Sequence, residues 1–108
     1  MASPLNTFKS IAANVTTIPS FIYTCPPDTT AIVLLAQATN INATIDGNVT
    51  FFSNLNSNTE LVKNFIIPVQ DAASLISGKL VLETGKSLGI YAHANNVLKI
   101  TLSILETK

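Results

Sequence analysis

Apolar and polar residues alternate with a period of two along most of the chain. The clearest example is the stretch "VLKITLSIL" at residues 97–105. Its alternate apolar positions are Leu98, Ile100, Leu102 and Ile104, and the residues between them are Lys99, Thr101 and Ser103. This pattern is typical of a β-strand with one buried face and one solvated face.

Turn-forming residues divide the chain into about eight segments of this kind, at a spacing of roughly ten residues. We predict strands at 9–15, 17–24, 29–39, 48–55, 60–69, 78–83, 87–94 and 97–105. The last three would form an antiparallel meander, with a two-residue hairpin at Asn95 and Asn96. One short helix is predicted over residues 72–77, with Asp71 as its N-cap and Gly78 as its stop.

These elements predict one all-β domain over residues 1–108, an antiparallel β-sandwich of the jelly-roll type, because no crossover helices are available for a parallel sheet. Residues 1–8 would be an extended N-terminal arm.

Two segments break the alternation, because "AIVLLAQA" (31–38) and "NFIIPV" (64–69) are apolar on both pleat faces. One interpretation is that one face meets the core and the other meets another subunit. The interface candidates are then Ile32, Leu34, Phe65 and Ile67. Val33 and Leu35 would replace Ile32 and Leu34 if the pleat faced the other way. The alternative is a central strand covered by a loop or by the 71–77 turn.

The charge content supports the first interpretation. Only 11% of residues are charged, against about 25% in an ordinary soluble domain, and the formal net charge is zero. A surface of Asn, Thr and Ser resists association poorly. Closed homo-oligomers are therefore expected.

Nucleic acid and membrane are not expected as partners. All six cationic residues are scattered lysines, so the chain has no arginine fork and no basic cluster for a phosphate backbone. No apolar run approaches the roughly 20 residues that a membrane span needs. The N-terminal sequence shows no signal peptide, which predicts synthesis in the cytoplasm.

Candidate catalytic chemistry centres on Cys25, the single cysteine. A reactive thiol needs a neighbour that lowers its pKa, and the single histidine, His93, lies far along the chain. Phe21, Tyr23 and Cys25 would share one face of an extended strand, so we interpret Cys25 as a buried structural thiol.

No catalytic, cofactor or metal site is predicted. The carboxylates are dispersed, and Glu60, Glu83 and Glu106 each lie near a strand end, where a solvated charge is expected. No cluster of His, Cys, Asp and Glu has metal-ligand spacing. The sequence therefore predicts a protein that is not an enzyme. Tyr91 and His93, on one strand face, are the candidate ligand face for the alternative of a carbohydrate-binding module.

Two stretches resemble small virion structural proteins of tailed bacteriophages. The first is "IYTCPPDTTAIVLLAQATN" (22–40), in which a strand ends in Tyr-Thr, a proline turn follows, and Thr-Ala-Ile-Val opens the next strand. The second, at residues 60–106, is similar to the same proteins in T4-like phages of cyanobacteria. Its pattern is a proline-ended strand, a short Asp-Ala turn, "GKLVL", a glycine turn and a final pair of strands. Cys25 and Pro27 depart from the usual turn.

This resemblance, over residues 18–106, implies a non-enzymatic protein of the virion. Such proteins decorate or cement capsids, or form neck, tail and fibre parts. The expected partners are the protein itself, as a homotrimer, and the major capsid protein or other virion proteins.

Overall fold

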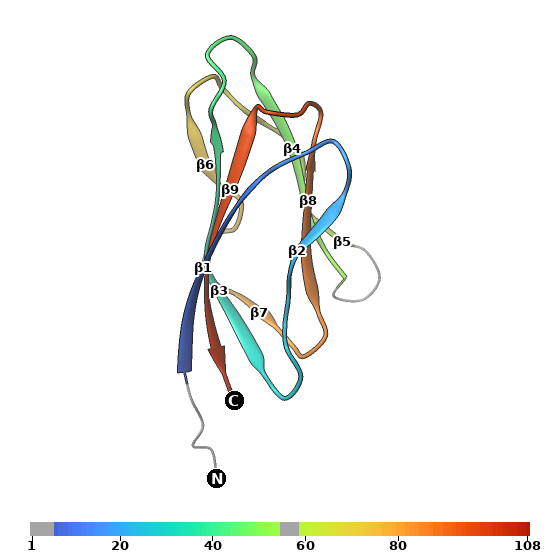
Figure 1. Cartoon of the computed structure of the whole chain (residues 1–108), viewed down its shortest axis with the longest axis vertical. Coiled ribbons are helices and arrows are strands. Elements are labelled where there is room, and N and C mark those ends of the chain that lie inside the picture. Colours follow the sequence, from blue (N-terminus) through green and yellow to red (C-terminus); the bar gives the residue numbers. More distant parts are fainter. Residues whose placement is uncertain (1–5, 55–58) are drawn as a thin grey trace.

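The computed structural model describes residues 6–54 and 59–108, which form nine β-strands in two facing sheets (Figure 1). The strands are β1 (Asn6–Asn14), β2 (Ser20–Thr24), β3 (Thr30–Asn40), β4 (Gly47–Ser53), β5 (Thr59–Ile67), β6 (Ala72–Ser74), β7 (Leu80–Leu82), β8 (Ser87–Ala92) and β9 (Leu98–Thr107). The described ranges contain no helix that could cross a membrane. The prediction of an antiparallel all-β sandwich is confirmed.

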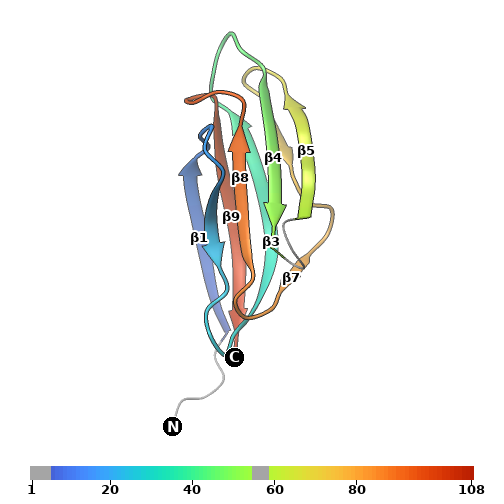
Figure 2. The same cartoon turned by 90° about the vertical axis from the view of Figure 1, so that its right-hand side faces the viewer.

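The strand order follows from a nested folding of the chain upon itself. β4 pairs with β5, β3 with both β6 and β7, β2 with β8, and β1 with β9, all antiparallel. Further pairing of β9 with β3 and of β8 with β4 completes a five-stranded and a four-stranded sheet. The four-stranded sheet lies in front in Figure 2. If β6 and β7 are counted as one interrupted strand, this is the eight-stranded arrangement of a jelly roll.

The predicted C-terminal meander is wrong. β7 and β9 belong to the five-stranded sheet, whereas β8 between them belongs to the four-stranded sheet. The Asn95–Asn96 connection therefore crosses from one sheet to the other, and Asn96 takes a positive φ of 63° there. Asparagine tolerates this conformation, but the turn residue alone does not distinguish a hairpin from such a crossing.

The predicted helix over residues 72–77 is also wrong. Ala72–Ser74 form strand β6, which pairs with β3, and the amide of Leu75 donates a hydrogen bond to the Ala36 carbonyl at 2.7 Å. A helix of one or two turns has little stability of its own. The backbone groups along the exposed edge of β3 provide the partners that this segment needs, and Leu75 is buried in the core.

The core lies between the two sheets and follows the predicted alternation. Leu98, Ile100, Leu102 and Ile104 of β9 are all fully buried. β1 begins at Asn6, so the predicted arm at residues 1–8 overlaps this strand by three residues, and residues 1–5 lie outside the described part of the chain.

Candidate interaction surface

An apolar row crosses the outer face of the five-stranded sheet at one end. Phe8 on β1 is paired with Leu105 on β9, Leu105 with Ile32 on β3, and Ile32 with Val81 on β7. Directly paired residues project from the same face of a sheet. Leu105 and Ile32 are half-buried, whereas Phe8 is 74% and Val81 55% exposed. We call these four residues the outer apolar row.

A bulge in β3 enlarges this apolar surface. The pairing of β3 with β9 skips Leu34, between Val33 and Leu35. Val33 faces the core and is fully buried, whereas Leu34 is 36% exposed and Leu35 is half-buried. Ile32 and Leu34 therefore face outward, as in the first of the two alternatives left open by the sequence. The bulge also turns Leu35 of the second alternative away from the core, whereas Val33 stays in it.

The predicted interface residues do not form one surface. Ile32 and Leu34 lie on the five-stranded sheet, but Phe65 and Ile67 lie on β5, the edge strand of the other sheet. Ile67 is fully buried and belongs to the core, which removes it as an interface candidate. Phe65 is 40% exposed and is paired with the buried Val49, so it lies at an open side of the sandwich.

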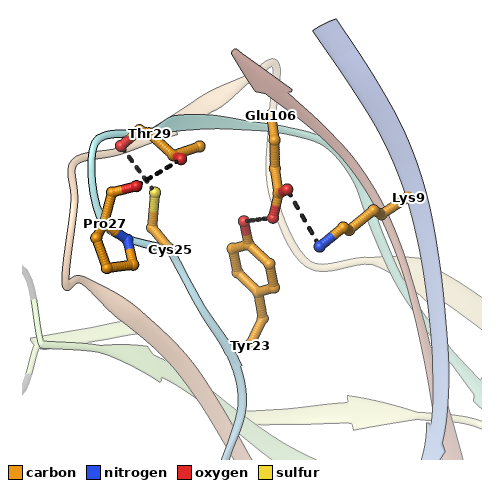
Figure 3. A network of polar contacts seen from close by, with 6 residues as sticks. All are labelled: Lys9, Tyr23, Cys25, Pro27, Thr29 and Glu106. Carbon is orange, nitrogen blue, oxygen red and sulfur yellow. Dashed lines mark hydrogen bonds and ion pairs between the residues drawn. The ribbon is translucent and has the colours of Figure 1, made fainter. Parts of the chain in front are cut away.

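Beneath the outer apolar row, a charged cluster joins three strands (Figure 3). The Nζ of Lys9 on β1 lies 3.1 Å from Oε1 of Glu106 on β9. The phenol of Tyr23 on β2, in the opposite sheet, donates a 2.6 Å hydrogen bond to Oε2 of the same carboxylate. Glu106 is only 8% exposed, so the prediction that it is a solvated charge is wrong.

The electrostatics of this cluster favour a fixed carboxylate. The hydrogen bond from Tyr23, with the nearby Lys9 ammonium, lowers the pKa of Glu106 in spite of its burial. Burial and the neighbouring carboxylate raise the pKa of Tyr23 well above its usual value. The cluster thus holds an ionised Glu106 and a neutral Tyr23, and it connects the two sheets and β1.

Cys25 lies beside this cluster as a buried thiol, as predicted. Its side chain is 1% exposed, and Sγ donates a hydrogen bond to the Thr29 carbonyl at 3.2 Å. Burial raises the pKa of the thiol, which disfavours the nucleophilic thiolate. Phe21 does not share its face, because a bulge between Phe21 and Tyr23 turns Phe21 outward, where it is 52% exposed.

The outer face of the four-stranded sheet carries three aromatic rings. The ring of Phe52 lies 5.6 Å from that of Phe21 and 6.1 Å from that of Tyr91. Gly89 lies between the two phenylalanines in the strand pairing, and a Cβ there would meet the Phe52 ring at 2.3 Å. The missing side chain lets the Phe52 ring lie against the sheet.

Tyr91 and His93 do not form the predicted ligand face together. Tyr91 lines a shallow depression on this face. The Nδ1 of His93 instead accepts a hydrogen bond from the Asn48 amide at 3.2 Å, and the His93 amide donates to the Asn48 carbonyl at 3.1 Å. Within residues 6–54 and 59–108, no three His, Cys, Asp or Glu side chains are grouped as metal ligands would be.

Comparison with known proteins supports the fold. No known protein family matches the chain, and no curated protein is significantly similar to it in sequence. Among the solved structures that are similar to it, one has a TM-score of 0.55 and 15% sequence identity over 97% of this chain and 88% of the other. It comes from work described as "Bacillus endospore appendages form a novel family of disulfide-linked pili". At this identity the likeness concerns the fold.

Sequence reasoning missed three of the four residues in the outer apolar row. Phe8 was excluded because the first strand was predicted to begin at Lys9, one residue later. Leu105 follows Ile104 and breaks the alternation of β9, which was a usable signal for a second apolar face. The place of Val81 depends on its pairing with Ile32, which residues 78–83 alone do not reveal.

Proposed function

We propose that this protein is a non-enzymatic structural subunit of a tailed-phage particle, and specifically a decoration or cement protein of the capsid. It associates with copies of itself and with the capsid surface through the outer face of the five-stranded sheet. It is made in the host cytoplasm and resides in the virion. The observation that carries the assembly role is the outer apolar row.

The row is unusual because it exposes apolar side chains on a strand whose inner face holds a charged one. In β1, Lys9 points toward Glu106 on the inner side while Phe8 points outward. Fully burying a side chain such as Phe8 or Val81 gains about 1.5–3 kcal/mol. A partner that covers the row therefore recovers a free energy that the isolated subunit lacks.

The outer face that carries the row has the size of a small interface. The row crosses four strands, and at about 4.8 Å per strand and about 3.3 Å per residue over ten residues the whole face measures about 600 Å². Two copies in contact over the whole face would bury about 1,200 Å² in total, the lower bound of specific interfaces, and a contact centred on the apolar end buries less than this. The outward strand positions of this face carry one charged residue, Lys99, so little charge must be desolvated.

The pilus protein with the same fold supports an assembly role, since pili are built from repeated subunits. A disulfide-linked assembly is not available to this chain, because Cys25 is its single cysteine and is buried. Non-covalent contacts must then hold the subunits together. The phage particle, the capsid site and a homotrimer rest on the sequence resemblance. Neck, tail or fibre placement is the alternative within the same particle.

The test compares two β1 variants on the same outer face. Phe8 and Asn14 are both exposed, at opposite ends of the strand. We expect the purified protein to have the mass of an oligomer by light scattering, and to bind undecorated capsids. Phe8→Ser should weaken both properties, and the control Asn14→Ser should leave both unchanged.

Electron microscopy of purified particles then locates the protein. Density on the capsid lattice supports decoration, and density confined to neck or tail supports the alternative placement. A strict monomer that leaves capsids unbound and is absent from particles would overturn the proposed function.

A further inference from the structure

The second sheet carries a separate feature on its outer face. A depression of about 160 Å³ lies there, lined by Pro19, Phe52, Glu60 and Tyr91. Pro19 precedes β2, Phe52 is on β4, Glu60 is on β5 and Tyr91 is on β8. The two sheets face each other across the core, so this depression and the outer apolar row lie on opposite sides of the sandwich (Figures 1 and 2).

The register of the sheet brings these residues together. Phe21, Gly89, Phe52 and Glu60 form one row across all four strands. Phe52 is 7% exposed and forms the floor, held in place by the absence of a side chain at Gly89. The half-buried Tyr91 ring stands at 52° to it, and the carboxylate of Glu60 lies at the rim.

The polar side chains at the rim of this site have no partner in residues 6–54 and 59–108. Neither the Tyr91 hydroxyl nor the Glu60 carboxylate makes a hydrogen bond or an ion pair there, although the hydroxyls of Thr24 and Ser53 do so on the same sheet. A phenol can donate and accept, and an ionised carboxylate accepts only. The site therefore combines a flat apolar floor with one donor and several acceptors at its rim.

We propose that this depression binds a neutral pyranose sugar. One face of such a ring carries C–H groups that pack on an aromatic surface, and its hydroxyl groups lie around the edge, where they can donate to Glu60 and exchange hydrogen bonds with Tyr91. The volume is below the roughly 300–1,000 Å³ of ordinary small-molecule pockets, which fits a single ring on an open surface.

Charge, hydrogen bonding and ring geometry each weigh against another class of ligand. The Glu60 carboxylate repels acidic sugars. A proline-rich peptide presents carbonyl acceptors, which a carboxylate cannot satisfy. A quaternary ammonium ion is bound best where ring faces surround it, whereas here Phe52 forms a floor with a single tilted ring beside it.

The inference stands apart from the proposed assembly role, because it concerns the opposite face. Its test is a nuclear magnetic resonance titration of the full chain with methyl glycosides of glucose, galactose, mannose and N-acetylglucosamine. We expect one of them to shift the signals of Tyr91, Phe52 and Glu60. Tyr91→Ser should weaken that binding at least tenfold, and Glu60→Gln, which keeps the shape, should weaken it severalfold.

The control variant is Phe8→Ser, which removes an exposed ring from the other sheet and should leave sugar binding unchanged. Conversely, Tyr91→Ser should leave the oligomer mass unchanged, so the two proposals fail separately. The absence of shifts with every sugar would overturn the inference. So would equal binding by Glu60→Gln, or a site that responds to choline or a proline-rich peptide but not to sugars.

Discussion

The two ends of the five-stranded sheet use the same pleat in opposite ways. At one end the inner positions include Lys9 and Glu106, while the outer positions carry the outer apolar row. At the other end the inner positions Ala38 and Ile100 are fully buried, and the outer positions opposite one another are Thr39 and Lys99.

We call the end with the outer apolar row the near end and the end with Thr39 and Lys99 the far end. The far end has apolar residues inside and polar residues outside, as is usual for a sheet face that is exposed to water. The near end has charged groups among its inner positions and apolar groups outside, although β1 and β9 stay in one unbroken register from end to end. A shift of β1 by one residue would exchange Phe8 and Lys9, because the side-chain period of a strand is two. The cluster around Glu106 fixes the register that leaves Phe8 outside.

The largest effect should follow from removal of that carboxylate. Glu106→Leu leaves the Tyr23 hydroxyl without its acceptor and Lys9 without its counter-ion. Because Lys9 is 46% exposed and can turn to water, we expect a loss of about 2–4 kcal/mol in the free energy of unfolding, below the full cost of an unpaired buried charge.

Urea denaturation measures this loss, and Glu83→Leu, at an exposed position, is the matched control. If Glu106→Leu were as stable as the parent protein, the cluster would not be what fixes β1.

The far end has its own buried polar residue, which is neutral. Asn40, 1% exposed, donates through Nδ2 to the carbonyls of Ile45 and Ile67 at 2.9 and 3.0 Å, and its Oδ1 accepts from the Asn42 amide at 2.8 Å. Asn40→Ala leaves these backbone groups without partners, so we expect a loss of about 2–3 kcal/mol.

Thermal unfolding of Asn40→Ala, compared with the exposed Asn14→Ala, checks the expectation. Equal melting temperatures would show that water replaces the amide without cost. A lower melting temperature for Asn40→Ala with an unchanged oligomer would separate the stability function of this end from the assembly function of the other.

The burial of these two polar residues, Glu106 and Asn40, could not be predicted from the sequence. The alternation in β9 correctly predicted its four core residues, because burial there depends on the strand itself. The burial of Glu106 depends on Tyr23, 83 residues away in sequence, and on Lys9 at the other end of the chain. Such partners are known only when the nested pairing of the strands is known.

The bulges limit prediction in the same way. Skipping one residue in the pairing within β2 and within β3 turns Phe21 and Leu34 to the outside. The period-two pattern has no signal for this in a stretch where neighbouring residues are all apolar. The outer faces, and with them the candidate sites, were therefore less predictable than the core.

A charge introduced at the near end should disrupt association, and the same charge at the far end should not. Val81 on β7 and Ala72 on β6 are both exposed, and both lie on the outer face beside β3. We expect Val81→Lys to weaken self-association at least tenfold, about 1.4 kcal/mol, because the ammonium would be buried against apolar side chains.

Sedimentation equilibrium of Val81→Lys and Ala72→Lys measures the difference. Both changes replace exposed side chains, so the stability of each subunit should change by less than about 0.5 kcal/mol. Equal weakening by both variants would mean that the whole face, rather than its apolar end, carries the contact.

A pH titration should distinguish the two ends more finely. The folded pKa of Glu106 lies below the ordinary 4.5, because the carboxylate is held by Tyr23 and Lys9. Its contribution to stability is therefore complete above the unfolded pKa and is lost as the pH falls from about 4.5 through the lower folded pKa. The difference in free energy of unfolding between the parent protein and Glu106→Gln should therefore become smaller below pH 4.5. The difference between the parent protein and Asn40→Ala should stay the same. Urea midpoints measured from neutral pH downward test this, and parallel curves for all three proteins would contradict it.

The smallest effect on assembly should come from Cys25, although it lies next to the charged cluster. Its thiol is buried, donates to the Thr29 carbonyl and has a raised pKa, so neither oxidation nor exchange with another subunit is favoured. One cysteine per chain could at most join two subunits, which does not propagate a fibre. We therefore expect the oligomer mass to be the same with and without dithiothreitol, and the same in Cys25→Ala.

The native thiol should resist an aromatic disulfide reagent until urea unfolds the chain. A mass that falls under reduction would show that Cys25 reaches the surface in the assembly, and it would move the contact from the outer apolar row to the turn that follows β2.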